Sequence, residues 1–150
     1  MPNVLGALRR RALTPNVAET RLEVRGFHVK NAATRNVLET VGASFLHGFG
    51  DAAECSDPAV LEHSLDQIPT RFRGFAYEGA AMALAIRDAL PLGRHDHVER
   101  FADGAGGAHV YMAYVGVGWA MARLPRLLWS TLYAPDPLLR WLVLDGYGFH

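Results

Sequence analysis

Glu78 is the side chain of this sequence whose surroundings most clearly call for a chemical explanation. It lies in the segment from Phe75 to Met82, where almost every other residue is apolar or small. A carboxylate buried in such a segment must be paired, hydrogen-bonded or protonated. It either bridges to an arginine of a neighbouring helix or acts as a general acid, general base or substrate-orienting group in an apolar pocket. Both interpretations stay open, and Glu78 is a candidate catalytic residue.

Asp145 poses the same question near the end of the chain. It follows the apolar run from Trp141 to Leu144 and precedes Gly146, where we expect a helix to stop. A carboxylate in the last turn opposes the helix dipole, so a nearby donor must compensate for it. That donor belongs either to a structural hydrogen bond or salt bridge, or to a site in which Asp145 is a second candidate catalytic residue.

Aromatic side chains with polar atoms accompany these carboxylates along the predicted helices. Gly116 and Gly118 precede Trp119, a pattern expected where a partner backbone or a flat ligand packs closely. Packing within the core is the competing interpretation. The candidate substrate-binding residues are Tyr77, Tyr111, Tyr114 and Trp119.

Strong catalytic and cofactor motifs are missing from the sequence. It contains no phosphate-binding loop, no His-Glu-x-x-His zinc helix, no Cys-x-x-Cys pair and no Gly-x-Ser-x-Gly elbow. His95 and His97 form a close pair of the kind that metal sites use, but they lie in a polar segment that also reads as a solvated loop. His109 would have to join them as a third ligand. We therefore assign no metal and no cofactor.

Composition limits the classes of partner. Fifteen basic residues balance fifteen acidic ones, which argues against a nucleic-acid-binding surface. Half of the residues are hydrophobic, as in globular proteins. Cys55 is the only cysteine, so no intramolecular disulfide forms and a reducing cytoplasm is the simplest compartment. The most apolar stretch, residues 105–122, carries His109 and several glycines, and we expect a buried core helix there rather than a membrane span.

Helical periodicity recurs along the chain between joints marked by proline or glycine. Asn31 and Asp57 are expected N-caps, with Pro58 at the first helical position. Gly48 and Gly50 are expected to loosen or end their helix. With no recurring strand pattern, the chain is expected to be all-α, an orthogonal helical bundle of about six helices. The six main predicted helical segments are 31–54, 57–68, 72–90, 95–102, 108–124 and 136–146, the last with Asp136 and Pro137 at its start. Residues 4–13 are expected to form a further short basic helix, and residues 126–133 to add one or two turns.

Two regions differ in character. Residues 1–30 form a basic N-terminal segment and an extended arm, in which Arg21 to Val29 carries a weak strand signal. Residues 31–150 form the helical domain. This domain ends at His150 within apolar, glycine-rich sequence, whereas domains usually finish in a polar tail. We predict that the domain is truncated at its C-terminus and that the natural polypeptide continues.

Four blocks, in order along the chain, resemble the enediyne biosynthesis protein family of bacterial natural-product gene clusters, whose members are also described only as a domain of unknown function. The resemblance covers most of the chain after about residue 40, and no catalytic residues are established for the family. The blocks are Phe45 to Gly50, Arg73 to Ala83, Gly116 to Leu124, and Leu144 to His150.

This resemblance implies a protein of two related halves, of which the present chain is the first. It also implies an accessory or tailoring role in enediyne-type polyketide biosynthesis, on or with a hydrophobic polyene intermediate. A non-catalytic binding or scaffold module, which pairs with itself or with other pathway proteins, is the first alternative. The second is a metal or haem enzyme that uses His95, His97, His109 or His150.

Overall fold

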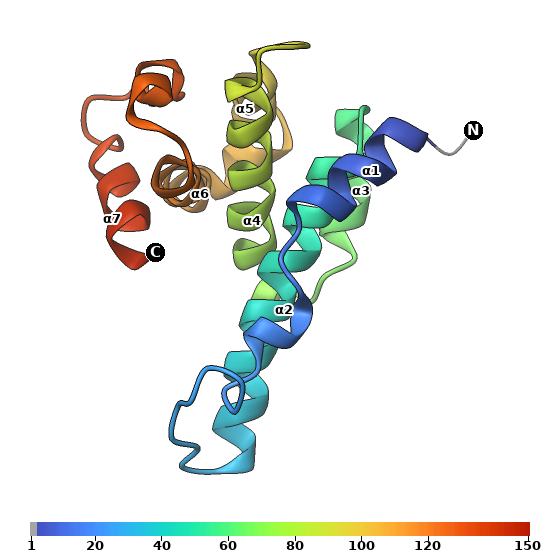
Figure 1. Cartoon of the computed structure of the whole chain (residues 1–150), viewed down its shortest axis with the longest axis vertical. Coiled ribbons are helices and arrows are strands. Elements are labelled where there is room, and N and C mark those ends of the chain that lie inside the picture. Colours follow the sequence, from blue (N-terminus) through green and yellow to red (C-terminus); the bar gives the residue numbers. More distant parts are fainter. Residues whose placement is uncertain (1–2) are drawn as a thin grey trace.

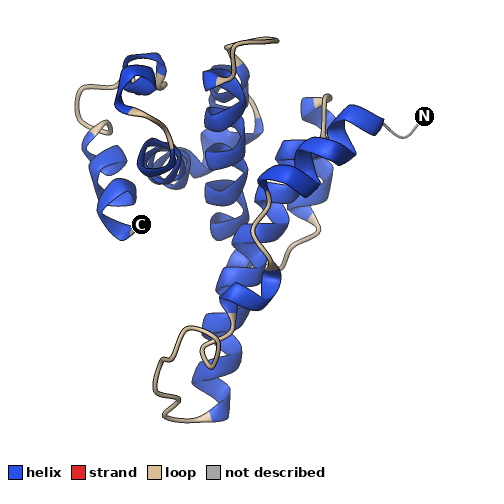
Figure 2. Ribbon diagram, viewed as in Figure 1, coloured by secondary structure: helices blue, strands red, loops and turns tan. Residues whose placement is uncertain are grey.

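The computed structural model describes residues 3–150, in which helices are joined by turns and loops and no strand occurs (Figure 2). The predicted all-α class is therefore confirmed. The α-helices are α1 (Val4–Leu13), α2 (Ala32–Glu54), α3 (Pro58–Asp66), α4 (Thr70–Ala89), α5 (His97–Asp103), α6 (Val110–Arg123) and α7 (Trp141–Phe149). Three short 3-10 segments join them: η1 (Val17–Thr20), η2 (Ala105–His109) and η3 (Arg126–Thr131).

Helix α4 lies at the centre of the bundle. Figure 1 shows α2 crossing it on one side and α6, seen end-on, on the other, with α7 beyond α6 at the edge of the molecule. The steep crossing of α4 and α6 is the orthogonal packing that the sequence predicts. The middle of α4 is buried over a long run of small residues, because helices cover it on both sides.

The predicted N-caps are confirmed. The Asn31 side chain accepts a hydrogen bond from the backbone N–H of Thr34 at 2.8 Å, and this begins α2. The Asp57 carboxylate accepts from the N–H of Ala59 at 2.9 Å, with Pro58 in the first position of α3. Each side chain satisfies a backbone donor that has no partner inside its helix.

The C-terminal end of α2 is capped by arginines from other helices. Arg9 of α1 donates to the carbonyl of Ala53 at 3.0 Å. Arg87 of α4 donates to the carbonyls of Ala52 and Cys55 at 2.8 and 2.7 Å. Guanidinium groups here meet both the unpaired carbonyls and the negative end of the helix dipole. The basic N-terminal segment is thus tied to the bundle through α1.

Glycines bring the backbones of neighbouring helices together. A Cβ atom at Gly48 of α2 would overlap the carbonyl oxygen of Ala76 in α4, and one at Gly79 of α4 would overlap that of Phe45 in α2. Because the two contacts are reciprocal, α2 and α4 approach at the level of their backbones. Gly48 therefore allows close packing of the two helices. The sequence predicts that α2 loosens or ends at Gly48 and Gly50, but the helix continues through both residues to Glu54.

The same reciprocal contact joins α6 to α7. A Cβ atom at Gly118 would overlap the carbonyl of Val143, and one at Gly146 would overlap the carbonyl of Val115. The sequence predicts that the last helix stops at Gly146, and this prediction is wrong. The helix continues to Phe149, because Gly146 faces α6 and is buried there.

The arm before α2 contains η1 and a series of turns over residues 22–26, so the weak strand signal of this region does not correspond to a strand. Within residues 3–150, no helix combines the length and the apolar character that crossing a bilayer requires.

Candidate functional site

Glu78 lies on the face of α4 that α6 covers. A Cβ atom at Gly116 of α6 would overlap the carbonyl of Glu78 itself and press on the Cβ of Ala81. The absence of that side chain lets α6 lie directly on this turn of α4. As a result Glu78 is only 7% exposed, in surroundings made mostly of small apolar residues.

Trp119 of α6 supplies the hydrogen bond to this carboxylate. Its indole Nε1 donates to Oε1 of Glu78 at 2.7 Å. Among the described residues no arginine forms an ion pair with Glu78, so the interhelical donor is the neutral indole rather than the guanidinium that we considered. Glu78 is therefore hydrogen-bonded, but its charge is not balanced.

Burial raises the pKa of Glu78 to about 7. The hydrogen bond from Trp119 acts in the opposite direction and lowers the pKa, and the negative charge of Asp145 raises it. A carboxyl group with this pKa exists in both protonation states near neutral pH. It can therefore give or take a proton under physiological conditions, as a general acid or base must.

Aromatic rings surround Trp119 and leave part of the cluster open to solvent. The Trp119 ring centroid lies 5.4 Å from that of Phe45 in α2, 6.3 Å from Phe149 and 6.1 Å from His150. Phe149 is 74% exposed. We call Phe45, Trp119, Phe149 and His150 the aromatic cluster. It places an accessible apolar surface next to one buried, protonatable carboxyl group.

Asp145 lies in the middle of α7, not in its last turn, because the helix runs on to Phe149. Its side chain is exposed and forms no hydrogen bond or ion pair within residues 3–150. The expected compensating donor is therefore not present in the described residues. What links Asp145 to the site is its charge, which raises the pKa of Glu78.

The three candidate tyrosines lie away from the aromatic cluster. Tyr77 points to the other side of α4, where its hydroxyl donates to Asp66 at 3.3 Å and its ring stacks on Phe101. Burial, with the nearby Asp66 charge, raises the pKa of Tyr77 to about 12. The Tyr114 hydroxyl accepts from the backbone N–H of Asp136 at 3.1 Å. Tyr111 is 64% exposed on α6. The structure thus brings together Glu78 and Trp119, with Asp145 near enough to act by its charge.

Asp88, near the end of α4, is a second buried carboxylate that sequence analysis did not single out. It accepts hydrogen bonds from the backbone N–H groups of His97 and Val98 at 2.9 and 3.0 Å and contacts His97 Nδ1 at 2.6 Å. The other ring nitrogen of His97 lies 3.0 Å from a guanidinium nitrogen of Arg87. An imidazole protonated on Nδ1 satisfies both contacts. The signal was the Asp88 charge itself, in a stretch of α4 where most of the preceding residues are apolar.

The histidines considered as metal ligands are engaged separately. His95 Nδ1 lies 2.7 Å from the carbonyl oxygen of Asp88, whereas His109 packs against Tyr77 in a tilted arrangement with ring centroids 4.2 Å apart. His150 belongs to the aromatic cluster. No group of three or more His, Cys, Asp or Glu side chains in the described part of the chain is arranged to hold a metal ion.

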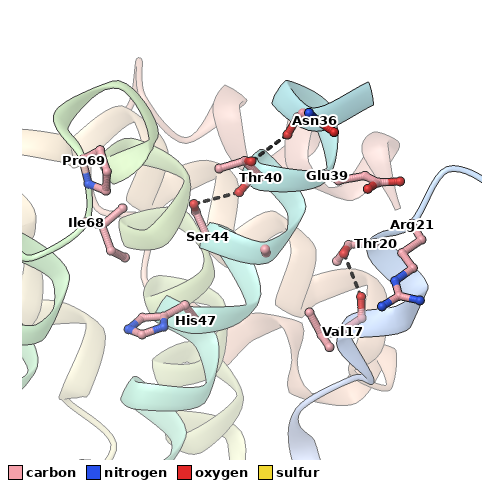
Figure 3. Close-up of a pocket in the computed structure, with 11 residues that line it drawn as sticks. Val17, Thr20, Arg21, Asn36, Glu39, Thr40, Ser44, His47, Ile68 and Pro69 are labelled. Atoms are coloured by element: carbon pink, nitrogen blue, oxygen red, sulfur yellow. Dashed lines mark hydrogen bonds between the residues drawn. The ribbon is translucent and has the colours of Figure 1, made fainter. Parts of the chain in front are cut away.

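A groove of about 510 Å³ lies along α2 (Figure 3), and Glu78 is not among the residues that line it. The arm with η1 forms one wall and the joint before α4 forms the other. The hydroxyls of Thr20, Thr40 and Ser44 each donate to a backbone carbonyl of their own segment, as the dashed lines show. Its lining includes Val17, Arg21, Asn36, Glu39, Ala43, His47, Ile68 and Pro69. The groove is open and mixed in polarity.

Comparison with known proteins gives a match to a protein family. No curated protein and no solved structure matches the chain. The model of a family described as "Protein of unknown function (DUF1702)" matches residues 4–150, which is nearly the whole chain. The matched region includes α4, α6 and α7, the helices that form the site around Glu78. The chain therefore belongs to the DUF1702 family of proteins of unknown function.

Proposed function

We propose that this protein binds a hydrophobic, conjugated molecule at the aromatic cluster and presents the Glu78 carboxyl to it as a proton donor or acceptor. The observation that carries the proposal is the pairing of Glu78 with Trp119 under partly exposed rings. The pKa of this carboxyl is about 7, and among the described residues it has one hydrogen-bond donor, which is bound at Oε1, so Oε2 carries no hydrogen bond from them. Apolar sites with few polar groups are typical of small-molecule binding.

The substrate class that fits is a polyene. Flat unsaturated chains stack on aromatic rings, and Phe45, Trp119 and Phe149 offer such rings from three helices. The resemblance of four sequence blocks to enediyne biosynthesis proteins supports a polyene intermediate of enediyne-type polyketide biosynthesis. We therefore propose an accessory or tailoring role in that pathway, with Glu78 as the acid or base and Asp145 as the charge that tunes it.

Binding is tested with diphenylhexatriene, a neutral conjugated probe whose fluorescence rises in apolar sites. We expect the chain to enhance its emission, and Trp119→Ala and Phe149→Ala to weaken binding. Trp129→Phe is the matched control, because Trp129 donates to the carbonyls of Met121 and Leu124, outside the cluster. Equal probe binding by the wild type and both cluster variants would contradict the proposal.

The role of the carboxylates is tested in a strain that makes the polyketide product. We expect Glu78→Gln to lower the product titre strongly, because the amide keeps the shape and the Trp119 hydrogen bond but cannot exchange a proton. Asp145→Asn is expected to have a smaller effect. A normal titre with folded Glu78→Gln protein would leave the binding role and remove the acid–base role.

A non-catalytic scaffold role is the second candidate. It is favoured by the apolar residues that α7 turns to solvent, of which Trp141 is 62% exposed. A normal titre with Glu78→Gln, together with a lowered titre on replacing these residues, would favour this role.

A further inference from the structure

Helix α7 has two apolar faces, of which only one is covered. Val143 and Gly146 point inward and are buried against α6. Trp141, Leu144 and Gly148 recur at helical spacing on the opposite side, which we call the outer face of α7. Trp141 and Leu144 are 62% and 49% exposed, and a Cβ atom at Gly148 would meet nothing within 4 Å. The outer face is thus apolar and largely exposed, and no helix among residues 3–150 packs on it.

Two opposite charges flank this outer face. Arg140 precedes Trp141, and Asp145 follows Leu144. Both side chains are exposed, and neither forms an ion pair within the described residues. Within the described residues, Trp141 and Leu144 therefore lie between the unpaired positive charge of Arg140 and the unpaired negative charge of Asp145.

We propose that the outer face of α7 pairs with the same face of a second copy of this chain, with the two helices antiparallel. A two-fold axis at the level between Leu142 and Val143 places Arg140 opposite the partner's Asp145. The same axis places Trp141 opposite the partner's Leu144. One symmetry operation satisfies both the charged and the apolar residues, which is the self-complementarity that an isologous interface requires.

Charge excludes the other simple arrangement. A parallel pair of α7 helices about a two-fold axis would put Arg140 against its own copy and Asp145 against its own copy. Like charges in contact oppose association, whereas the antiparallel pair forms each ion pair twice. The position of α7 at the edge of the bundle leaves its outer face accessible to such a partner (Figure 1). Since one helix pair makes a small interface, the dimer is expected to be weak.

Sedimentation equilibrium over a wide range of protein concentration tests the proposal. The wild type is expected to show a monomer–dimer equilibrium. Arg140→Asp and Asp145→Arg should each weaken the dimer roughly ten-fold or more, because each change replaces two attractions by two repulsions. The double variant exchanges the charges within one chain and should restore most of the wild-type affinity.

Arg11→Asp is the matched control, since Arg11 is an exposed arginine of α1 on the far side of the molecule (Figure 1). It should leave the dimer unchanged, and circular dichroism checks that every variant keeps its helices. A wild-type chain that remains monomeric at every concentration would overturn the proposal. So would a double variant that dimerises no better than the two single variants. Trp141→Ala, which keeps the charges, is expected to abolish the dimer without unfolding the chain.

Discussion

The two buried carboxylates of α4 have nearly the same exposure but differ in the number of hydrogen-bond donors around them. Asp88 is 8% exposed and Glu78 is 7% exposed. Asp88 receives two backbone N–H groups and an imidazole nitrogen. Glu78 receives one indole N–H, and the charge of Asp145 acts against its ionisation. At Asp88, protein donors replace the hydrogen bonds from water that burial removes. At Glu78, the single protein donor replaces only part of those hydrogen bonds.

This difference separates a structural group from a reactive one. Asp88 joins the end of α4 to the start of α5, and each of its contacts fixes chain geometry. Glu78 fixes little beyond the orientation of Trp119, and its pKa of about 7 keeps the proton exchangeable. Perturbed acids of this kind gather at functional sites more than at structural ones. The comparison therefore predicts a loss of stability when Asp88 is removed, but a gain at high pH when Glu78 is neutralised.

Asp88→Ala should have the largest effect. It leaves two buried backbone donors and His97 without their acceptor, so we expect the free energy of unfolding to fall by about 3–5 kcal/mol. Chemical denaturation measures this. Asp96→Ala is the control, because Asp96 forms an exposed ion pair with Arg94 and its loss should cost far less stability than the loss of Asp88. Similar losses for the two variants would contradict the structural role of Asp88.

Glu78→Gln should change how stability depends on pH. The pKa of Glu78 is raised by folding, so the folded state holds its proton more tightly than the unfolded state. The contribution of Glu78 to stability is therefore fully present below pH 4.5, is lost as pH rises through about 7, and stays lost above that pH. The variant lacks this loss, and the difference between the two proteins should reach roughly 2–3 kcal/mol at high pH. Parallel stability curves for variant and wild type across this range would contradict the raised pKa.

Trp119→Phe should affect Glu78 from the other direction. It removes the hydrogen bond that lowers the pKa of Glu78, so the pKa should rise further. The smaller ring should also lower stability by about 1–2 kcal/mol. Trp129→Phe loses comparable packing and should leave the pKa of Glu78 unchanged, which separates the two consequences.

Asp145→Asn should have the smallest effect. The change removes a negative charge that raises the pKa of Glu78, so that pKa should fall slightly. Because Asp145 is exposed, salt should screen its influence. Raising the ionic strength of the wild type should therefore shift the pKa of Glu78 in the same direction as the substitution does. No response of the Glu78 pKa to either change would show that the charge of Asp145 does not contribute to it.

Much of the fold could be predicted from local sequence, and much of the site could not. Asn31 and Asp57 act within their own turns, so the residues around them suffice to identify the caps. Glycine is ambiguous because it both weakens helices and allows close packing. At Gly146 the second role prevails, since the backbone of α6 lies against it and the helix continues.

Glu78 was identifiable because a charge among apolar residues is visible in the sequence. Its donor was not, since Trp119 meets it only where Gly116 allows α6 to approach α4. The same limit applies to Asp88, whose donors belong to the next helix. Hydrogen bonds between side chains of different helices depend on how the helices pack, which residue spacing within one helix does not predict.

The central claim is that Glu78 changes its protonation state near neutral pH. Carboxyl-carbon NMR of the wild-type chain, with the Glu78 resonance assigned by its loss in Glu78→Gln, measures this directly. A titration midpoint at about 7 is the expected result. A midpoint near 4.5, the ordinary glutamate value, would show that the carboxylate is solvated or paired, and the acid–base site would not exist.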